Sequence, residues 1–180
     1  MSIRYLFPDN TVLCNFAVVD RLNLLETILN GRGRWTSAVA GEAEASAQYL
    51  PALRIVVSAG WMGEPIEITD DTDVLQVERV RRVVFGGTDA KPLQHLGEAE
   101  TCHVIRNLPK FASSWWITDD REALRYAKRQ GIPAYETIDL MAMAVNDGDV
   151  VDGAAFELME RMASCGRSLR MPVGPTSFRR

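Results

Sequence analysis

The sequence lacks any apolar run near the roughly 18 residues that a membrane-spanning helix needs. Its opening, MSIRYLFPDN, also lacks the long apolar stretch and small-residue cleavage site of a signal peptide. These two absences exclude a membrane-spanning protein and favour a cytoplasmic one without a membrane partner.

Cysteine is scarce, and its spacing forms no known pattern. The three cysteines, Cys14, Cys102 and Cys165, are odd in number, lie far apart and include no CxxC pair. This argues against both a disulfide framework and a zinc site. We expect core cysteines in a reducing compartment.

A basic excess is also missing, since 20 Lys and Arg stand against 24 Asp and Glu, for a formal net charge of -4. Nucleic-acid binders often carry a basic excess. The balance is compatible with an RNA substrate if the acids concentrate in a metal site and the bases form local patches. Arg32 with Arg34, and Arg79 with Arg81 and Arg82, are two such groups. The charge sum alone neither proves nor excludes RNA.

What is present is the composition of a globular domain. The chain has 180 residues, 47% of them hydrophobic and 24% charged, which suits one domain with a sizeable core. No repeat, low-complexity block or linker divides it. We therefore expect a single domain over residues 1–180, with a core of about 1–145 and a helical extension and tail over 146–180.

Short strands alternate with helices along the chain. Apolar spacing and turn residues predict strands at 3–7, 65–69, 115–118 and 133–135, with 35–37 as a short connector or strand. Helices are expected at 10–29, 38–50 (capped by Ser37), 72–84, 93–107, 119–130, 138–145 and 153–164, and a loosely ordered tail at 171–180. The alternation favours an α/β fold with a parallel sheet covered on both faces.

Two of the expected strands end directly in acid, the first in Asp9 and the later one in Asp119 and Asp120. Ligands of open parallel sheets bind beyond the carboxyl ends of the strands, so these acids would converge if the strands are neighbours. Glu42 and Glu98 lie early in the helices expected at 38–50 and 93–107 and can point into the same cleft.

Crowded carboxylates repel one another, and a bound cation relieves that repulsion. Hard oxygen ligands without a nearby thiolate or imidazole set favour Mg²⁺ or Mn²⁺. Such an ion can activate a water for attack at phosphorus and stabilise the charge that develops. We therefore hypothesise a phosphodiester-cleaving metal site.

Four segments resemble the motifs of the PIN-domain ribonuclease family, in the family's order. They are FPDNTVLCNF with Asp9, TSAVAGEAEAS with Glu42, HLGEAE with Glu98, and ITDDREALRYAKRQGI with Asp119 and Asp120. The resemblance covers roughly residues 1–140. The third and fourth motifs are fairly specific, whereas the first two are weak alone.

The resemblance implies a Rossmann-like sheet of about five parallel strands, flanked by helices on both faces. It also implies Mg²⁺- or Mn²⁺-dependent RNA cleavage and often a homodimer. Many bacterial members are toxins of the VapC type, paired with an antitoxin protein. The catalytic residues would be Asp9, Glu42, Glu98, Asp119 and Asp120, and all of these except Glu42 would be metal ligands.

The sequence departs from the family pattern at several positions. Asn10 follows Asp9 where Thr or Ser is common, and Leu96-Gly97 alters the residues before Glu98, so that helix start is expected to differ. Glu44 competes with Glu42 for the second position. The threonine-x-aspartate spacing from Thr118 favours Asp120 over Asp119.

Each acid also has an ordinary structural role open to it. Asp9 and the 119–120 pair can cap helices, and Glu42, Glu44 and Glu98 can be solvated surface residues. Their joint occurrence favours the site. Thr36 and Thr118 are candidates to orient carboxylates or waters. The histidines at 95 and 103 are not expected to bind metal, and the tryptophans at 115 and 116 are expected in the core.

The main rival function is a non-catalytic RNA- or protein-binding protein of the same fold. Phosphatases of the haloacid dehalogenase type need a DxD after the first strand, but Asn10-Thr11 follows Asp9. A response-regulator receiver would place its acid pair near the first strand, whereas this pair comes late.

The segment from 153 onward carries an apolar helix face of Ala155, Leu158, Met159 and Met162. This face either completes the core or contacts another chain. Methionines suit an adaptable contact surface, so we hypothesise that the face supports a homodimer or an antitoxin contact.

Overall fold

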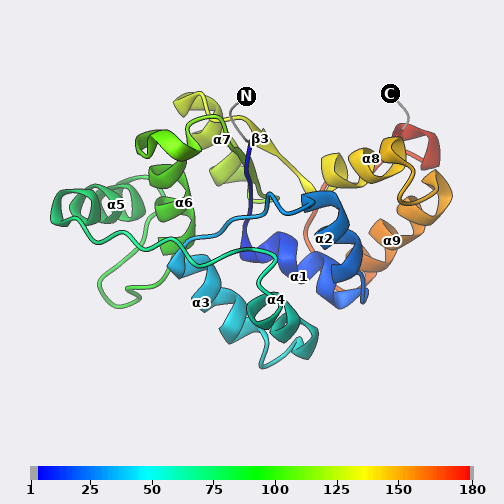
Figure 1. Cartoon of the computed structure of the whole chain (residues 1–180), viewed down its shortest axis with the longest axis horizontal. Coiled ribbons are helices and arrows are strands. Elements are labelled where there is room, and N and C mark those ends of the chain that lie inside the picture. Colours follow the sequence, from blue (N-terminus) through cyan, green and yellow to red (C-terminus); the bar gives the residue numbers. More distant parts are fainter. Residues whose placement is uncertain (1–3, 179–180) are drawn as a thin grey trace.

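The computed structural model describes residues 4–178 and has a parallel sheet with helices on both sides (Figure 1). The strands are β1 (Leu6–Pro8), β2 (Trp115–Ile117) and β3 (Ala134–Tyr135). The α-helices are α1 (Asn10–Val18), α2 (Leu22–Leu29), α3 (Ser37–Ser46), α4 (Arg54–Ser58), α5 (Asp71–Val83), α6 (Leu96–Asn107), α7 (Arg121–Gln130), α8 (Thr137–Asp147) and α9 (Asp152–Ser164), and short 3-10 helices lie at Pro51–Leu53 (η1), Pro109–Phe111 (η2) and Pro175–Phe178 (η3). No helix in this described part is long and apolar enough to cross a membrane.

The sheet places β2 between β1 and β3, with every pair parallel. Two isolated parallel bridges extend it beyond β1. Leu6 pairs with Gly33, and Thr36 pairs with Ile66. If the five segments are numbered along the chain, their order side by side is 3-2-1-4-5. Only three of them are regular strands among residues 4–178. Doubly wound sheets have their segments in this order, with the direction of winding reversing between the first and the fourth segment.

Alternate side chains on the central strands enter two separate hydrophobic clusters. Leu6 and Ile117 belong to the larger cluster, which includes residues of α1, α2, α3, α8 and α9. Phe7 and Trp116 belong to the smaller one, with residues of α6 and α7. Successive side chains of a strand point to opposite faces of the sheet, and both faces are covered, so neighbouring residues enter different clusters. Figure 1 shows α5 and α6 on one side of the molecule, and α8 and α9 on the other.

Several predicted elements differ from the structure. The helix expected over 10–29 is two helices, because Asp20 adopts a left-handed conformation (φ 55°) and ends the first. Residues 65–69, expected as a strand, contribute one bridge at Ile66. The helix over 38–50 instead ends at Ser46, and its cap is Thr36 rather than Ser37. α4 was not predicted. The expected start of the first strand, Ile3, lies outside the described residues.

The C-terminal region is packed into the larger cluster. Ala155, Leu158, Met159 and Met162 are all buried there, so this apolar face of α9 completes the core and is not open to a partner chain. The prediction of a loosely ordered tail is wrong for its described part, because Phe178 is fully buried and its carbonyl accepts a hydrogen bond from Asn146 Nδ2 at 2.9 Å. Residues 179 and 180 lie outside the described part.

Phe178 tests whether the tail belongs to the fold. We expect Phe178→Ala to lower the free energy of unfolding by about 3–5 kcal/mol, because it leaves a cavity among packed side chains. Val173→Ala is the matched control, since Val173 is fully exposed, and it should change little. Urea unfolding followed by circular dichroism measures both. Equal, small effects would show that the tail contributes nothing to stability.

Candidate active site

The two central strands end side by side, and an acid follows each of them. Asp9 comes directly after β1 and caps α1, where its Oδ1 accepts a hydrogen bond from the Val12 amide at 2.9 Å. Its Oδ2 accepts a hydrogen bond from Thr118 Oγ1 at 2.5 Å. The Asp9 amide donates to the Ile117 carbonyl at 2.9 Å. Asp9 is therefore tied to the end of β2, and the expected orienting role of Thr118 is confirmed.

Asp119, after β2, is held by groups from α1 and α8. Its Oδ2 accepts hydrogen bonds from Asn15 Nδ2 at 2.8 Å and from Thr137 Oγ1 at 2.5 Å, and its Oδ1 accepts one from the Thr137 amide at 3.0 Å. Asn15 and Thr137 are fully buried. No sequence pattern marks either of them, because a single asparagine within a helix and a threonine at a helix start are common.

Asp120 has a different role from its neighbour. It is exposed, and its Oδ1 caps α7 by accepting from the amides of Glu122 at 2.8 Å and Ala123 at 2.7 Å. The spacing from Thr118 favoured Asp120 as the functional acid, but the structure directs Asp119 toward Asn15 and Thr137.

Glu42 and Glu98 come from α3 and α6, which pack together. The Gly97 amide hydrogen-bonds to Glu42. A Cβ at Gly97 would lie 2.9 Å from Glu42 Oε1 and 3.1 Å from a Val39 methyl. Gly97 therefore allows α6 to begin against the Glu42 carboxylate. Glu44, on the same helix, is exposed, so the structure favours Glu42 of the two candidates.

Glu100 is a further acid that sequence reasoning missed. Its Oε2 accepts a hydrogen bond from the Ala38 amide at 3.0 Å, and its carboxylate also bonds to the Thr36 side chain. Glu100 thus fastens α6 to the first turn of α3, the helix that carries Glu42. A carboxylate at a helix start stabilises the unpaired amides there.

Electrostatic coupling connects four carboxylates, because the charges of Asp119 and Glu98 act on Asp9 and those of Glu98 and Asp9 act on Glu42. Burial raises the pKa of Asp9 to about 7, and the charges of Asp119 and Glu98 add to the rise, against hydrogen bonds that lower it. Burial raises the pKa of Glu42 to about 8, with further contributions from the charges of Glu98 and Asp9. Burial also raises the pKa of Asp119. These couplings place Asp9, Glu42, Glu98 and Asp119 in one cluster, which we call the acid cluster.

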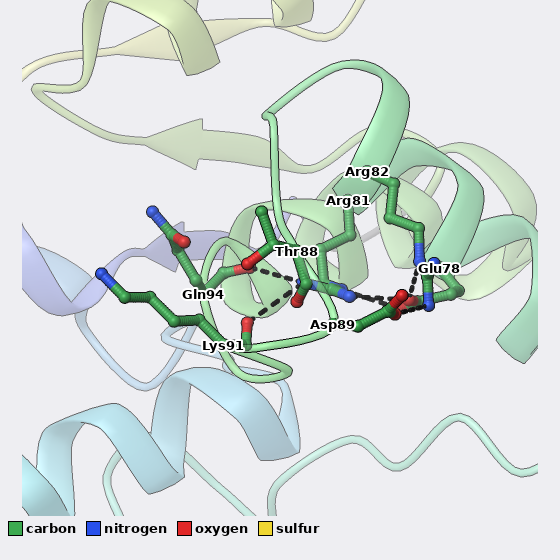
Figure 2. A network of polar contacts seen from close by, with 7 residues as sticks. All are labelled: Glu78, Arg81, Arg82, Thr88, Asp89, Lys91 and Gln94. Carbon is green, nitrogen blue, oxygen red and sulfur yellow. Dashed lines mark hydrogen bonds and ion pairs between the residues drawn. The ribbon is translucent and has the colours of Figure 1, made fainter.

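The loop before α6 is held by a buried arginine (Figure 2). Arg81, 1% exposed, donates through Nη1 to the carbonyls of Thr88, Lys91 and Gln94, each at 3.3 Å. Its Nε and Nη2 bind Glu78 at 2.7 and 2.6 Å, and these bonds contribute to lowering the pKa of Glu78 to about 2. The ordered loop fixes where α6 begins.

At the end of this loop, His95 adopts a left-handed conformation (φ 62°), and its Nδ1 lies 3.2 Å from Glu98 Oε1. His103 is buried further along α6, beside Asp73 at 3.3 Å. The two histidines therefore face different groups.

Three arginines of the groups noted in the sequence make contacts within the fold, whereas Arg79 is exposed. Arg81 is buried, and Arg82 forms ion pairs with Glu78 and Asp89. Arg34 lies over the Tyr5 ring at 4.5 Å. The arginines beside the acid cluster are others, from α7 and the C-terminal region.

The carboxylate oxygens of the acid cluster fit a hard divalent cation such as Mg²⁺ or Mn²⁺, and the Cys14 thiol and the His95 ring lie beside them. Within residues 4–178, no three His, Cys, Asp or Glu side chains already form a group that could hold a metal ion. Hydroxyl and amide groups occupy oxygens of Asp9 and Asp119. Metal binding at the cluster would thus involve side-chain rearrangement.

Comparison with models of known families, with curated proteins and with solved structures finds no match.

Stability should depend on pH through the buried acids. A raised pKa means that the folded state keeps its proton to a higher pH than the unfolded chain does. From about pH 5 to about pH 8 the unfolded carboxylates are ionised already, so the free energy of unfolding should fall as Asp9 and Glu42 lose their protons. We expect a loss on the order of a few kcal/mol.

Melting curves in chelator across this pH range measure the effect. Asp9→Asn should raise the melting temperature at pH 8 and flatten the profile, while Asp120→Asn, which keeps a capping oxygen, should do neither. A wild-type melting temperature that is constant or rises from pH 5 to pH 8 would contradict the buried acid cluster.

Gly97→Ala tests the close approach of α6 to Glu42. The added methyl must displace the Glu42 carboxylate, while alanine favours the helix by about 1 kcal/mol. We expect little change in melting temperature but a weaker stabilisation by Mn²⁺. Gly153→Ala is the control, because a Cβ at Gly153, in α9, meets no atom within 4 Å. An unchanged Mn²⁺ response in Gly97→Ala would show that Glu42 takes no part in metal binding.

Proposed function

We propose that this protein is a metal-dependent endoribonuclease with a PIN-like fold. The observation that carries the proposal is the convergence of Asp9, Glu42, Glu98 and Asp119 where the winding of the sheet reverses. Four acids from separate parts of the chain lie half-buried and close enough to couple electrostatically, and their repulsion costs stability. The 3-2-1-4-5 order of parallel segments supports the same proposal.

Asp9, Glu98 and Asp119 would hold the Mg²⁺ or Mn²⁺, with Glu42 beside them. The bound ion would activate a water and stabilise the charge on the phosphate. The protein's own groups keep the acids in place. Thr118 orients Asp9, the buried pair Asn15 and Thr137 orients Asp119, and Asp120 caps α7.

Glu42 can act as a proton acceptor. Without a bound cation, burial and the charges of Glu98 and Asp9 raise its pKa to about 8. A cation held by those neighbours would lower this pKa and favour the ionised form, which accepts a proton. Its hydrogen bond from the Gly97 amide fixes the carboxylate. Glu42 is therefore suited to take a proton from the attacking water.

The second candidate is a non-catalytic RNA- or protein-binding protein of the same fold. The observation that favours it is the engagement of Asp9 and Asp119 by hydroxyl donors, which satisfies these acids without a metal. A toxin–antitoxin pairing and a homodimer also remain proposals, and the apolar face of α9 does not serve them.

Cleavage of mixed RNA by the purified protein, with and without Mn²⁺, separates the two candidates. We expect metal-dependent cleavage that chelator abolishes. Asp9→Asn and Glu98→Gln remove a negative ligand while keeping the side-chain shape, and should each lower the rate by on the order of a hundredfold or more. Wild-type rates in both variants, or cleavage indifferent to chelator, would contradict the proposal.

Matched pairs decide the open positions. Glu42→Gln should slow cleavage, while Glu44→Gln should leave it unchanged because Glu44 is exposed. Asp119→Asn should slow it more than Asp120→Asn does. The reverse ranking in either pair would move the site to the other acid.

A further inference from the structure

The chain after α9 returns to the acid cluster. Arg167 donates through Nε to Asn15 Oδ1 at 2.8 Å and through Nη2 to the Thr11 carbonyl at 3.4 Å. The same asparagine donates to Asp119 at 2.8 Å. Pro172, Phe178 and the partly buried Leu169 anchor the segment in the fold. We call residues 167–171 the strap.

The strap forms one wall of a cleft of about 1040 Å³. Ser168 to Met171 line one wall, and Asp119 to Arg121, Glu136 and Thr11 line the rest. The cleft therefore opens directly onto a member of the acid cluster. Its volume is of the order found in sites that enclose small molecules, which gives room for a short piece of one nucleic-acid strand.

Two arginines line this cleft from different parts of the chain. Arg121, the first residue of α7, is exposed. Arg170, on the strap, is 56% exposed, and its Nε donates to Glu136 Oε2 at 2.7 Å, with Nη2 3.7 Å from Asp139. These carboxylates hold the Arg170 side chain in one direction. A guanidinium so oriented matches the geometry of a phosphate.

We propose that the cleft binds single-stranded RNA, with Arg121 and Arg170 contacting phosphates next to the one at the acid cluster. This rests on the proposed function. The acids on the walls would repel phosphate wherever they are not neutralised, so the two arginines supply the attraction that the net charge of -4 does not. The strap is thus a substrate-binding element.

Binding of a fluorescently labelled, mixed-sequence RNA 12-mer, measured by anisotropy in chelator, tests the cleft apart from cleavage. We expect R121Q/R170Q to weaken binding at least about tenfold and to reduce the salt slope by about 0.7 for each phosphate that no longer binds a guanidinium group. The control R54Q/R79Q removes the same charge from exposed positions on α4 and α5 and should weaken binding much less.

Equal weakening by the two double variants, or none by R121Q/R170Q, would overturn the proposal, as would a wild-type protein that does not bind the RNA. If the melting temperature of R121Q/R170Q is much lower than that of the wild type, the single variant R121Q replaces it in the binding assay, because R121Q breaks no ion pair that holds the strap. If R121Q/R170Q loses binding while wild-type protein with Mn²⁺ cleaves no RNA, the cleft stands and the nuclease activity fails.

Discussion

The hydrogen bond from Thr118 to Asp9 joins the ends of the two central strands, and the rest of the site is arranged around it. It holds an acid at the carboxyl ends of two parallel strands, β1 and β2, the end of such sheets at which ligands bind. The buried carboxylate is costly, as its pKa of about 7 indicates. The surrounding helices supply hydrogen bonds that offset part of this cost without removing it.

The helices are fixed relative to one another by polar contacts rather than by apolar packing alone. Glu100 fastens α6 to α3, Asn15 connects α1 to Asp119, and Arg167 connects the strap to Asn15. Because the Asn15 oxygen accepts from Arg167, its amide nitrogen faces Asp119. The C-terminal region therefore fixes the direction of a hydrogen bond within the site, in addition to completing the core.

Much of this arrangement could be predicted from local sequence. The three regular strands, the helices from α5 onward, and the meeting of Asp9 with Asp119 follow from alternation and from acids after strands. The motif favoured Glu42 but left Glu44 open, since both lie on α3 and only packing against Gly97 separates them. The break at Asp20 escaped prediction because the apolar spacing continues through it, and residues 65–69 alternate like a strand but lie at the sheet edge, with one bridge.

The roles of the arginines could not be predicted from the sequence, because they depend on contacts between residues far apart in the chain. Arg81 lies in a charged, helical stretch that is typical of a solvated surface, yet it is buried because three loop carbonyls converge on it. Arg121 and Arg170 are 49 positions apart in the sequence, and they line the same cleft only because the strap folds back over α1. The net charge of the chain predicts neither the burial of Arg81 nor the position of the two cleft arginines. The electric field at the acid cluster depends on the few charged groups that the fold brings near it. A protein with a negative net charge can therefore still present guanidinium groups beside its carboxylates.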